Sequence, residues 1–259
     1  MSPTDFWVRF VDAVVKEIHN EWGGRSPSAQ WRKSDGSRVT DLDLRLDTAI
    51  RVILARHYST ASVVSEEIGV LNPATDSSSR QITAIVDPVD GTESLVNGRH
   101  SWWTSIGLLV DERPAGGLIY QPSTQVLHDS MRPAKKQSHH FTIGMSPDQL
   151  EADEAAGVRR RFLDHGAELR SIPHASEKVA AVLEGRCTAS VYLPSSKSPG
   201  WHSWDLAACI AIASANNIVL RSLSGSTLQV ALDSDLHNDA WICAYDEKSW
   251  AAAQEAILQ

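Results

Sequence analysis

Residues 85–95, IVDPVDGTESL, place two aspartates directly after an apolar segment. Residues 82–86 are mostly apolar or β-branched, which predicts a buried strand. Asp87 and Asp90 follow it only three positions apart, and a glycine and a threonine come next. Such a strand brings two negative charges to one point of the fold, which is costly unless something binds there.

The backbone chemistry of this segment predicts a sharp turn at the end of the strand. Pro88 fixes its own φ and has no N–H, while Gly91 adopts conformations that are closed to other residues. Both aspartates can then point into one space, with the Val89 carbonyl between them. Carboxylate and carbonyl oxygens are the donors that Mg²⁺ prefers. The alternative is an ordinary β-turn, because Asp, Pro and Gly are common turn residues.

The residues after Asp90 indicate a place for an anion. If a helix begins there, the N–H groups in front of it can form an anion-binding concavity. The hydroxyl of Thr92 lies in the same segment, where it can hold a water molecule or a phosphate oxygen. The stretch therefore combines a cation site with an anion site.

Further acidic residues lie in comparable positions elsewhere in the chain. Glu66 and Glu67 follow the short apolar segment VVS, Asp205 begins a predicted helix in WHSWDLAA, and Asp43 lies in VTDLDLRLD. Each has a simpler alternative: Asp205 as a helix N-terminal acid favoured by the dipole, and Asp43 as an exposed polar position on an amphipathic helix. Taken together, the four segments would supply enough carboxylates for two or three magnesium ions.

These segments, in this order, resemble the inositol monophosphatase superfamily of magnesium-dependent, lithium-sensitive phosphatases. The superfamily patterns are approximately V-T-x-x-D, [GS]-E-E, D-P-[IL]-D-G-T and W-D-x-A-A. This chain contains VTDLD at 39–43, SEE at 65–67, DPVDGT at 87–92 and WDLAA at 204–208. One such motif is weak evidence, but four in register are specific, and they extend over most of the chain.

The resemblance implies a set of metal ligands. Glu66, Asp87 and the Val89 carbonyl would hold one Mg²⁺, and Asp87, Asp90 and Asp205 would hold a second. Asp43 matches the position associated, largely through water, with a third and weaker ion.

The resemblance also implies the catalytic and phosphate-binding residues. Glu66 and Thr92 would position the attacking water and help to deprotonate it, and Asp43 would belong to the same catalytic set. Asp90, Gly91 and Thr92 would line the phosphate site. Homodimers are common in the superfamily, so a homodimer is expected here.

The pattern of elements predicts a mixed α and β protein whose sheets are covered by helices. With the resemblance, we expect an α+β fold, a layered αβαβα sandwich of alternating helices and mixed β-sheets in two closely packed lobes. Polar residues at 131–140 predict the boundary between the lobes. Residues 1–138 would then form the N-terminal metal-binding and catalytic lobe. Residues 139–259 would form the C-terminal substrate-specificity lobe and contribute Asp205.

Composition excludes several functional classes. The chain of 259 residues carries a net charge of −8, which argues against binding to nucleic acid polymers. Its three cysteines form no C-x-x-C pair, and no apolar segment approaches the ~20 residues of a membrane span. The N-terminus does not resemble a signal peptide, so we expect a cytoplasmic protein.

The substrate is less well indicated, because the chain departs from the family patterns. His174, Ala175 and Ser176 lie where inositol monophosphatases have G-[ST]-A-A, and Ser198 replaces a glutamate, which argues against inositol. Ser176 and Lys178 resemble the end of the G-S-S-x-K motif of bisphosphate-nucleotide phosphatases. Lys178 could then pair with a second phosphate, or simply lie on a helix face.

Other side chains near the expected substrate site have two interpretations each. Trp102, Trp103 or Trp201 could stack on a base, although buried tryptophans usually belong to the core. His174 could contact substrate or be a hydrogen-bonded structural residue. Glu93, next to the expected anion site, departs from the family without an evident reason.

The sequence thus predicts a Mg²⁺-dependent phosphomonoesterase that acts on a small sugar, polyol or nucleotide phosphate through metal-activated water. One alternative is a 3′(2′),5′-bisphosphate nucleotidase. An alternative from another class is a non-catalytic member of the superfamily that binds a protein.

Overall fold

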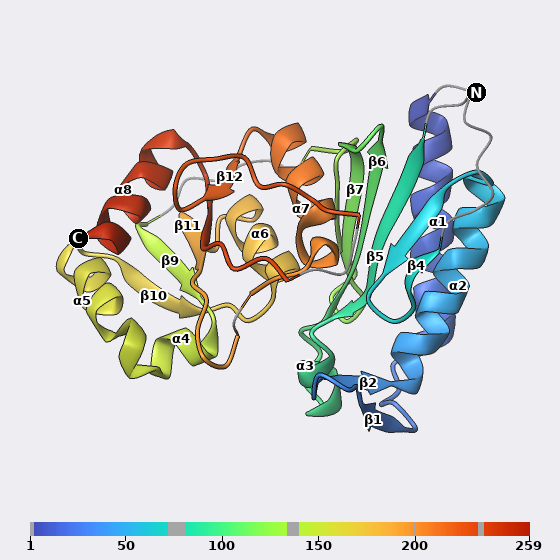
Figure 1. Cartoon of the computed structure of the whole chain (residues 1–259), viewed down its shortest axis with the longest axis horizontal. Coiled ribbons are helices and arrows are strands. Elements are labelled where there is room, and N and C mark those ends of the chain that lie inside the picture. Colours follow the sequence, from blue (N-terminus) through green and yellow to red (C-terminus); the bar gives the residue numbers. More distant parts are fainter. Residues whose placement is uncertain (1–2, 72–80, 134–139, 199, 233–235) are drawn as a thin grey trace.

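The computed structural model describes residues 3–71, 81–133, 140–198, 200–232 and 236–259. The fold is a layered α+β arrangement of helices and mixed sheets, as expected. In Figure 1 the layers follow one another as α1 with α2, a first sheet, α6 with α7, a second sheet, and α5 with α8. These helices are α1 (Pro3–Trp22), α2 (Asp41–His57), α5 (Ala156–Asp164), α6 (Ala175–Leu183), α7 (Ser203–Asn216) and α8 (Glu247–Leu258).

The first sheet has six strands within the described residues, and all of them precede residue 130. Its central strand alternates between two apolar layers. Ala84 and Val86 pack toward α1 and α2, while Ile85 packs with Ala207 of α7. The order is β4 (Gly69–Leu71), β3 (Ser62–Ser65), β5 (Ile82–Asp90), β6 (Trp103–Val110), β7 (Arg113–Gln121) and β8 (Val126–Asp129).

Strand β5 does not end at Val86, so that predicted boundary is wrong. The strand continues through both aspartates, with Asp87 opposite Ser105 and Asp90 opposite Trp103 of β6. The pairing thus advances by three residues on β5 but by only two residues on β6, which is a β-bulge. The sharp turn comes at Gly91, whose φ is 110°. A bulge re-aims side chains, and here it lies at the two aspartates that the sequence singles out.

The second sheet has five strands within the described residues, and all of them follow residue 140. The lobe boundary expected at residues 138–139 falls on residues outside the described ones, so the division into lobes stays a prediction. The order is β10 (Glu168–Ser171), β9 (Thr142–Met145), β11 (Ala189–Tyr192), β13 (Trp241–Ala244) and β12 (Val219–Ser222).

Helix α7 lies unusually close to the first sheet because two glycines face it. A Cβ on Gly107 of β6 would lie 2.6 Å from the Ala207 Cβ, and a Cβ on Gly117 of β7 would lie 2.5 Å from the Ala208 carbonyl oxygen. Larger residues at these positions would displace the helix. The helix ends at Asn216, and the next residue, Asn217, has a φ of 53°, a left-handed conformation that asparagine tolerates.

Several shorter elements differ from the sequence expectation. Ser146 and Pro147 are typical of a helix start and Gly166 of a helix end, which predicts one helix between them. This segment is instead divided into α4 (Pro147–Glu151), a 3₁₀ turn (Asp153–Ala155) and α5. A hairpin of β1 (Gln30–Arg32) and β2 (Arg38–Thr40) was not predicted, and α3 (Thr92–Val96) follows Gly91. The composition of residues 72–80, NPATDSSSR, predicts an exposed loop, and this segment lies outside the described residues. Within the described part of the chain, no helix has the length and apolar character of a membrane span.

Candidate active site

A cleft of about 590 Å³ brings together acidic residues that are distant in the sequence. Its walls are the β1–β2 hairpin, the end of β5 with the start of α3, and the start of α7. The predicted residues that line it are Glu66, Asp87, Val89, Asp90, Gly91, Thr92, His174 and Asp205. Asp43, Ser176 and Lys178 are not part of this lining.

Regular elements position the four acids of the cleft. Asp87 and Asp90 lie on the bulge of β5, Glu66 directly follows β3, and Asp205 lies in the first turn of α7. Strand β3 pairs in parallel with β5, so the ends of both strands reach the same edge of the sheet. Helix α7 reaches the cleft from the opposite layer because it packs closely on the first sheet.

The pKa shifts of Asp87 and Asp205 show that the acids of the cleft influence one another. Burial, followed by the charges of Glu66, Asp90 and Asp205, raises the pKa of Asp87 well above its usual value. Burial, followed by the charge of Asp90, does the same to the pKa of Asp205. Like charges have this effect only at short range in a poorly solvated site. The acids therefore form one electrostatic unit.

Backbone N–H groups orient three of the four carboxylates, which keeps one oxygen of each in a fixed direction. The bonds come from Val89 to Asp87 Oδ1 (2.9 Å), from Ser176 to Asp90 Oδ2 (2.8 Å) and from His202 to Asp205 Oδ2 (2.6 Å). Ser176, which the sequence linked to substrate, thus contacts the site through its backbone.

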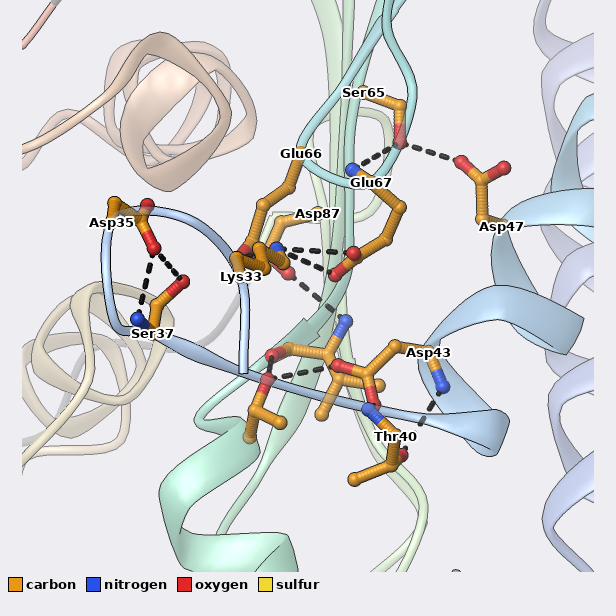
Figure 2. A network of polar contacts seen from close by, with 12 residues as sticks. Lys33, Asp35, Ser37, Thr40, Asp43, Asp47, Ser65, Glu66, Glu67 and Asp87 are labelled. Carbon is orange, nitrogen blue, oxygen red and sulfur yellow. Dashed lines mark hydrogen bonds and ion pairs between the residues drawn. The ribbon is translucent and has the colours of Figure 1, made fainter. Parts of the chain in front are cut away.

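The carboxylate of Glu66 is paired with a lysine (Figure 2). Lys33 of the hairpin places its Nζ 2.8 Å from Glu66 Oε1 and 3.0 Å from Glu67 Oε2. Burial acts to lower the pKa of Lys33, but the two glutamates outweigh it and raise the pKa overall. Burial and the Glu66 charge raise the pKa of Glu67 to about 7.

No three His, Cys, Asp or Glu side chains among the described residues stand in position to hold a metal ion together. The acids share a cleft, but they do not form a ready-made ligand set. Lys33 gives a physical reason, because its ammonium group supplies positive charge to Glu66 from within the same cleft. Cation binding to all four acids would require Glu66 to exchange this partner.

Asp43 is fully buried, so the interpretation of an exposed helix position is wrong. It caps the first turn of α2 together with Thr40, whose N–H lies 3.0 Å from Asp43 Oδ2 (Figure 2). Its other oxygen accepts a hydrogen bond of 2.8 Å from the Thr92 hydroxyl, which also lies 3.2 Å from the Val89 carbonyl. Burial raises the pKa of Asp43, although these hydrogen bonds oppose the rise.

Gly91 and His174 lie against each other at the base of the cleft. A Cβ on Gly91 would lie 2.6 Å from His174 Nε2, so this contact needs glycine for space as well as for its positive φ. His174 Nε2 is 2.9 Å from the Ser94 hydroxyl, and Nδ1 is 4.0 Å from Asp90 Oδ1. Burial lowers the pKa of His174, while the charge of Asp90 opposes this shift.

Glu93, which departs from the family pattern, has a partner in the hairpin. Arg38 Nε lies 3.1 Å from Glu93 Oε2, and Asn97 donates to the other carboxylate oxygen at 3.1 Å. The ion pair connects β2 with α3 across the mouth of the cleft. The negative charge next to the expected anion site is thus offset.

The predicted substrate residues Lys178 and the tryptophans lie deeper in the fold. Lys178 is 1% exposed, and burial lowers its pKa to about 7 although Asp90 and Glu177 oppose the shift. Trp102 and Trp103 are fully buried in hydrophobic cores rather than at the cleft.

Further residues line the cleft, among them Lys33 and Arg38, which sequence reasoning did not identify, and also His202 and Trp204. The last two stack on each other with ring centroids 4.4 Å apart. A signal existed for the first two. They flank an Asp-Gly turn in WRKSDGSRVT, a pattern typical of hairpins, immediately before the V-T-x-x-D motif.

Comparisons with known proteins agree with this architecture. The sequence profile described as the inositol monophosphatase family matches residues 5–258. A Streptomyces griseus protein named glucose-1-phosphate thymidylyltransferase is 36% identical over 208 residues, which are 72% of this chain and 73% of the relative. Nus factor SuhB of Vibrio cholerae is 23% identical over 206 residues, which are 76% of each. A solved structure from Pyrococcus horikoshii, described as having similarities for inositol-1 monophosphatase, has a TM-score of 0.78 at 16% identity and covers 98% of both chains.

Proposed function

Because the chain belongs to the inositol monophosphatase family, we propose that it is a Mg²⁺-dependent phosphomonoesterase for a small phosphorylated metabolite. The observation that carries the proposal is the convergence of Glu66, Asp87, Asp90 and Asp205 in one cleft. Four acids in a poorly solvated space are costly without a counter-charge. The family is generally metal-dependent, and a divalent cation supplies that charge.

The cleft contains the types of ligand atom that magnesium prefers. Asp87, Asp90, Asp205 and Glu66 offer carboxylate oxygens, and Val89 offers its carbonyl, which are the hard donors that Mg²⁺ selects. The raised pKa values of Asp87 and Asp205 fit as well, because a bound cation favours the ionised carboxylates. Bound Mg²⁺ would lower the pKa of a water molecule and offset charge on the phosphate and the leaving oxygen.

The chain's own residues orient the reacting groups. Asp43 accepts the Thr92 hydrogen bond and so fixes the direction of that hydroxyl at the cleft. The hydroxyl oxygen can then accept a hydrogen bond from a water molecule. Glu66 would be the second group that positions this water, once Lys33 has moved away. Gly91 and the N–H groups at the start of α3 lie where the phosphate would bind.

Other family properties belong to the same proposal. These are occupation by two or three ions, inhibition by lithium, a homodimer and a cytoplasmic location. The division into a catalytic lobe of residues 1–138 and a specificity lobe of residues 139–259 also belongs to it. The candidate substrates are small phosphate esters, including those of polyols, sugars and histidinol, and bisphosphorylated nucleotides.

The proposal is tested by phosphate release from a panel of such esters, with Mg²⁺, with EDTA, and with Mg²⁺ plus Li⁺. We expect hydrolysis with Mg²⁺ alone. Asp87→Asn should reduce kcat by at least about a hundredfold, because that carboxylate would contact both ions. Asp164→Asn is the matched control, since Asp164 is an exposed acid on α5. Unchanged turnover in Asp87→Asn would contradict the proposal.

Two relatives give specific alternatives to hydrolysis. The name of the Streptomyces griseus relative denotes thymidylyl transfer, which a mixture of dTTP and glucose 1-phosphate would reveal as pyrophosphate release. The name of the Vibrio cholerae relative denotes a Nus factor, which favours the non-catalytic protein-binding alternative. Activity confined to adenosine 3′,5′-bisphosphate would select the nucleotidase, and no hydrolysis across the panel would favour protein binding.

A further inference from the structure

Helix α2 carries two buried carboxylates one turn apart. Asp43 and Asp47 are 0% and 1% exposed. Their spacing of four residues places both on the same face of the helix, about 6 Å apart along its axis. Like charges at this spacing are unfavourable, and a buried carboxylate is costly unless it is hydrogen-bonded. Because the arrangement does not favour the helix itself, its contribution lies in the groups that the two carboxylates hold.

Asp47 holds a serine that immediately precedes Glu66. The hydroxyl of Ser65, which is fully buried, donates to Asp47 Oδ1 at 2.5 Å, while Asp47 Oδ2 accepts from Arg51 Nε at 2.8 Å. A hydroxyl has one proton, so donation to Asp47 leaves the Ser65 oxygen as an acceptor only. That oxygen accepts the N–H of Glu67 at 3.4 Å, and Figure 2 shows Ser65 between Glu67 and Asp47.

The turn at residues 66–68, between β3 and β4, is attached to the fold on two sides. Its first N–H, from Glu66, bonds to the Val86 carbonyl of β5 at 3.1 Å. Its second N–H, from Glu67, is the one that Ser65 accepts. The first bond attaches the turn to the sheet, and the second connects it to α2. Loss of the second bond would leave the turn attached to the sheet alone, so the Glu66 carboxylate would no longer be held in one direction at the cleft.

Asp43, the other buried carboxylate, holds the second residue of the proposed water-positioning pair. Its Oδ1 accepts the Thr92 hydroxyl at 2.8 Å. Under the proposed function, Thr92 and Glu66 position the attacking water together. Thr92 is attached to α2 directly, and the turn that carries Glu66 is attached through Ser65. Because both carboxylates lie on one regular helix, the separation of the two attachments is fixed.

We propose that Asp47, acting through Ser65, is a positioning residue for Glu66. Helix α2 thereby fixes the place of Glu66 relative to Thr92. The proposal rests on the proposed phosphatase function and deepens it. Neither Asp47 nor Ser65 is part of the lining of the cleft, so neither contacts the substrate or the proposed ions. Both act on the reaction only through the placement of Glu66.

The test uses Ser65→Ala, which removes the hydroxyl without a change of charge. Because Glu66 is a proposed ligand, a loosely held turn should weaken cation binding and misplace the attacking water. We expect the apparent Kd for Mn²⁺, measured by electron paramagnetic resonance without substrate, to rise about three- to tenfold. With saturating Mg²⁺, kcat for the most reactive ester of the panel should fall about three- to thirtyfold. The KM for that ester should change less than about twofold, because the phosphate would bind at the start of α3.

Asp47→Asn tests whether Asp47 acts through Ser65. The amide oxygen should remain on Arg51, because a hydrogen bond to a charged group is the stronger one, and the amide N–H would then face the Ser65 hydroxyl. We expect changes in Kd and kcat like those of Ser65→Ala. The double variant should be no more impaired than the more impaired single variant, because both remove the same connection.

Ser222→Ala is the matched control for the loss of a buried serine hydroxyl. Ser222 lies on β12 of the second sheet, and its hydroxyl oxygen accepts the Ser226 N–H at 3.1 Å. This variant should retain the wild-type Kd for Mn²⁺ and the wild-type kcat. If Asp47→Asn does not fold, as judged by circular dichroism, Ser65→Ala carries the test.

The outcomes separate this inference from the function on which it rests. Wild-type Mn²⁺ binding and wild-type kcat in Ser65→Ala overturn the positioning proposal and leave the phosphatase intact. Losses in the two single variants that multiply in the double variant also overturn it, because Asp47 would then act independently of Ser65. Absence of hydrolysis by the wild type for every ester overturns the phosphatase proposal and this inference together.

Discussion

At the residue scale, the character of the site comes from carboxylates that the fold keeps away from water. Asp87 is buried and Asp205 half-buried, and each accepts a backbone hydrogen bond. Loss of solvation, followed by the charges of acidic neighbours, raises the pKa of both carboxyl groups. Lys33 offsets part of this charge by pairing with Glu66. The cluster therefore lowers the stability of the metal-free protein, and a divalent cation should restore it.

This cost has a pH dependence whose sign follows from the raised pKa of Asp205. The folded chain holds the Asp205 proton more tightly than the unfolded chain, so stability falls as the pH rises from about 4 through the raised pKa. Asp205→Asn removes this titration and keeps an oxygen for the His202 N–H. We expect the variant's free energy of unfolding minus that of wild type to become more positive between about pH 5 and about pH 8, because only wild type loses stability through this titration.

Urea unfolding in EDTA at the two pH values measures this difference. Excess Mg²⁺ should reverse its sign at the higher pH, because wild type alone retains the full ligand set. A difference that does not change with pH would mean that Asp205 is ionised in the folded chain at both values.

The residue scale also shows the limits of sequence reasoning. The acids were recognisable because each lies in a short motif next to a strand or at a helix start. The hydrogen bond between Thr92 and Asp43 was not, because 49 positions separate them and the contact depends on how α2 and α3 meet. Likewise, nothing near Glu93 in sequence reveals Arg38 as its partner.

At the element scale, helix α7 carries Asp205 to the cleft only because it packs closely on β6 and β7. Gly107 and Gly117 permit this approach. Helix α7 and both strands are recognisable in the sequence because each is a mostly apolar segment. Sequence patterns missed the bulge in β5 and the division of the helix before Gly166, because both depend on pairing and packing with distant segments.

Gly117→Ala tests whether this packing matters for function. The new Cβ would lie 2.5 Å from the Ala208 carbonyl oxygen, which is backbone and cannot move without the helix. We expect a loss of about 1–3 kcal/mol in the free energy of unfolding and a reduction in phosphatase kcat. Gly157→Ala is the control. Its Cβ would meet a side chain rather than backbone, the Arg161 guanidinium at 3.3 Å, and alanine favours a helix more than glycine, so stability should change little.

Thermal unfolding and phosphate release measured on the two variants decide the question. A Gly117→Ala protein with wild-type stability and activity would show that the position of α7 tolerates displacement.

At the scale of the whole molecule, the account depends on acids from residues 66–205 meeting in one cleft between the layers of the fold. The family resemblance predicted this convergence, and the structure brings Glu66, Asp87, Asp90 and Asp205 to one cleft. It did not predict that Lys33 would pair with Glu66, or that helix α2 would hold the turn that carries this glutamate. Those features belong to the hairpin and helix α2 of this chain.

The central claim is that the shared cleft is a divalent-cation site, and anomalous diffraction tests it most directly. Crystals grown with Mn²⁺ in place of Mg²⁺ should show anomalous peaks bounded by Glu66, Asp87, Asp90 and Asp205, with the Lys33 ammonium displaced from Glu66. The same crystals of Asp87→Asn should lose those peaks. A wild-type crystal with Lys33 still on Glu66 and no manganese in the cleft would contradict the account.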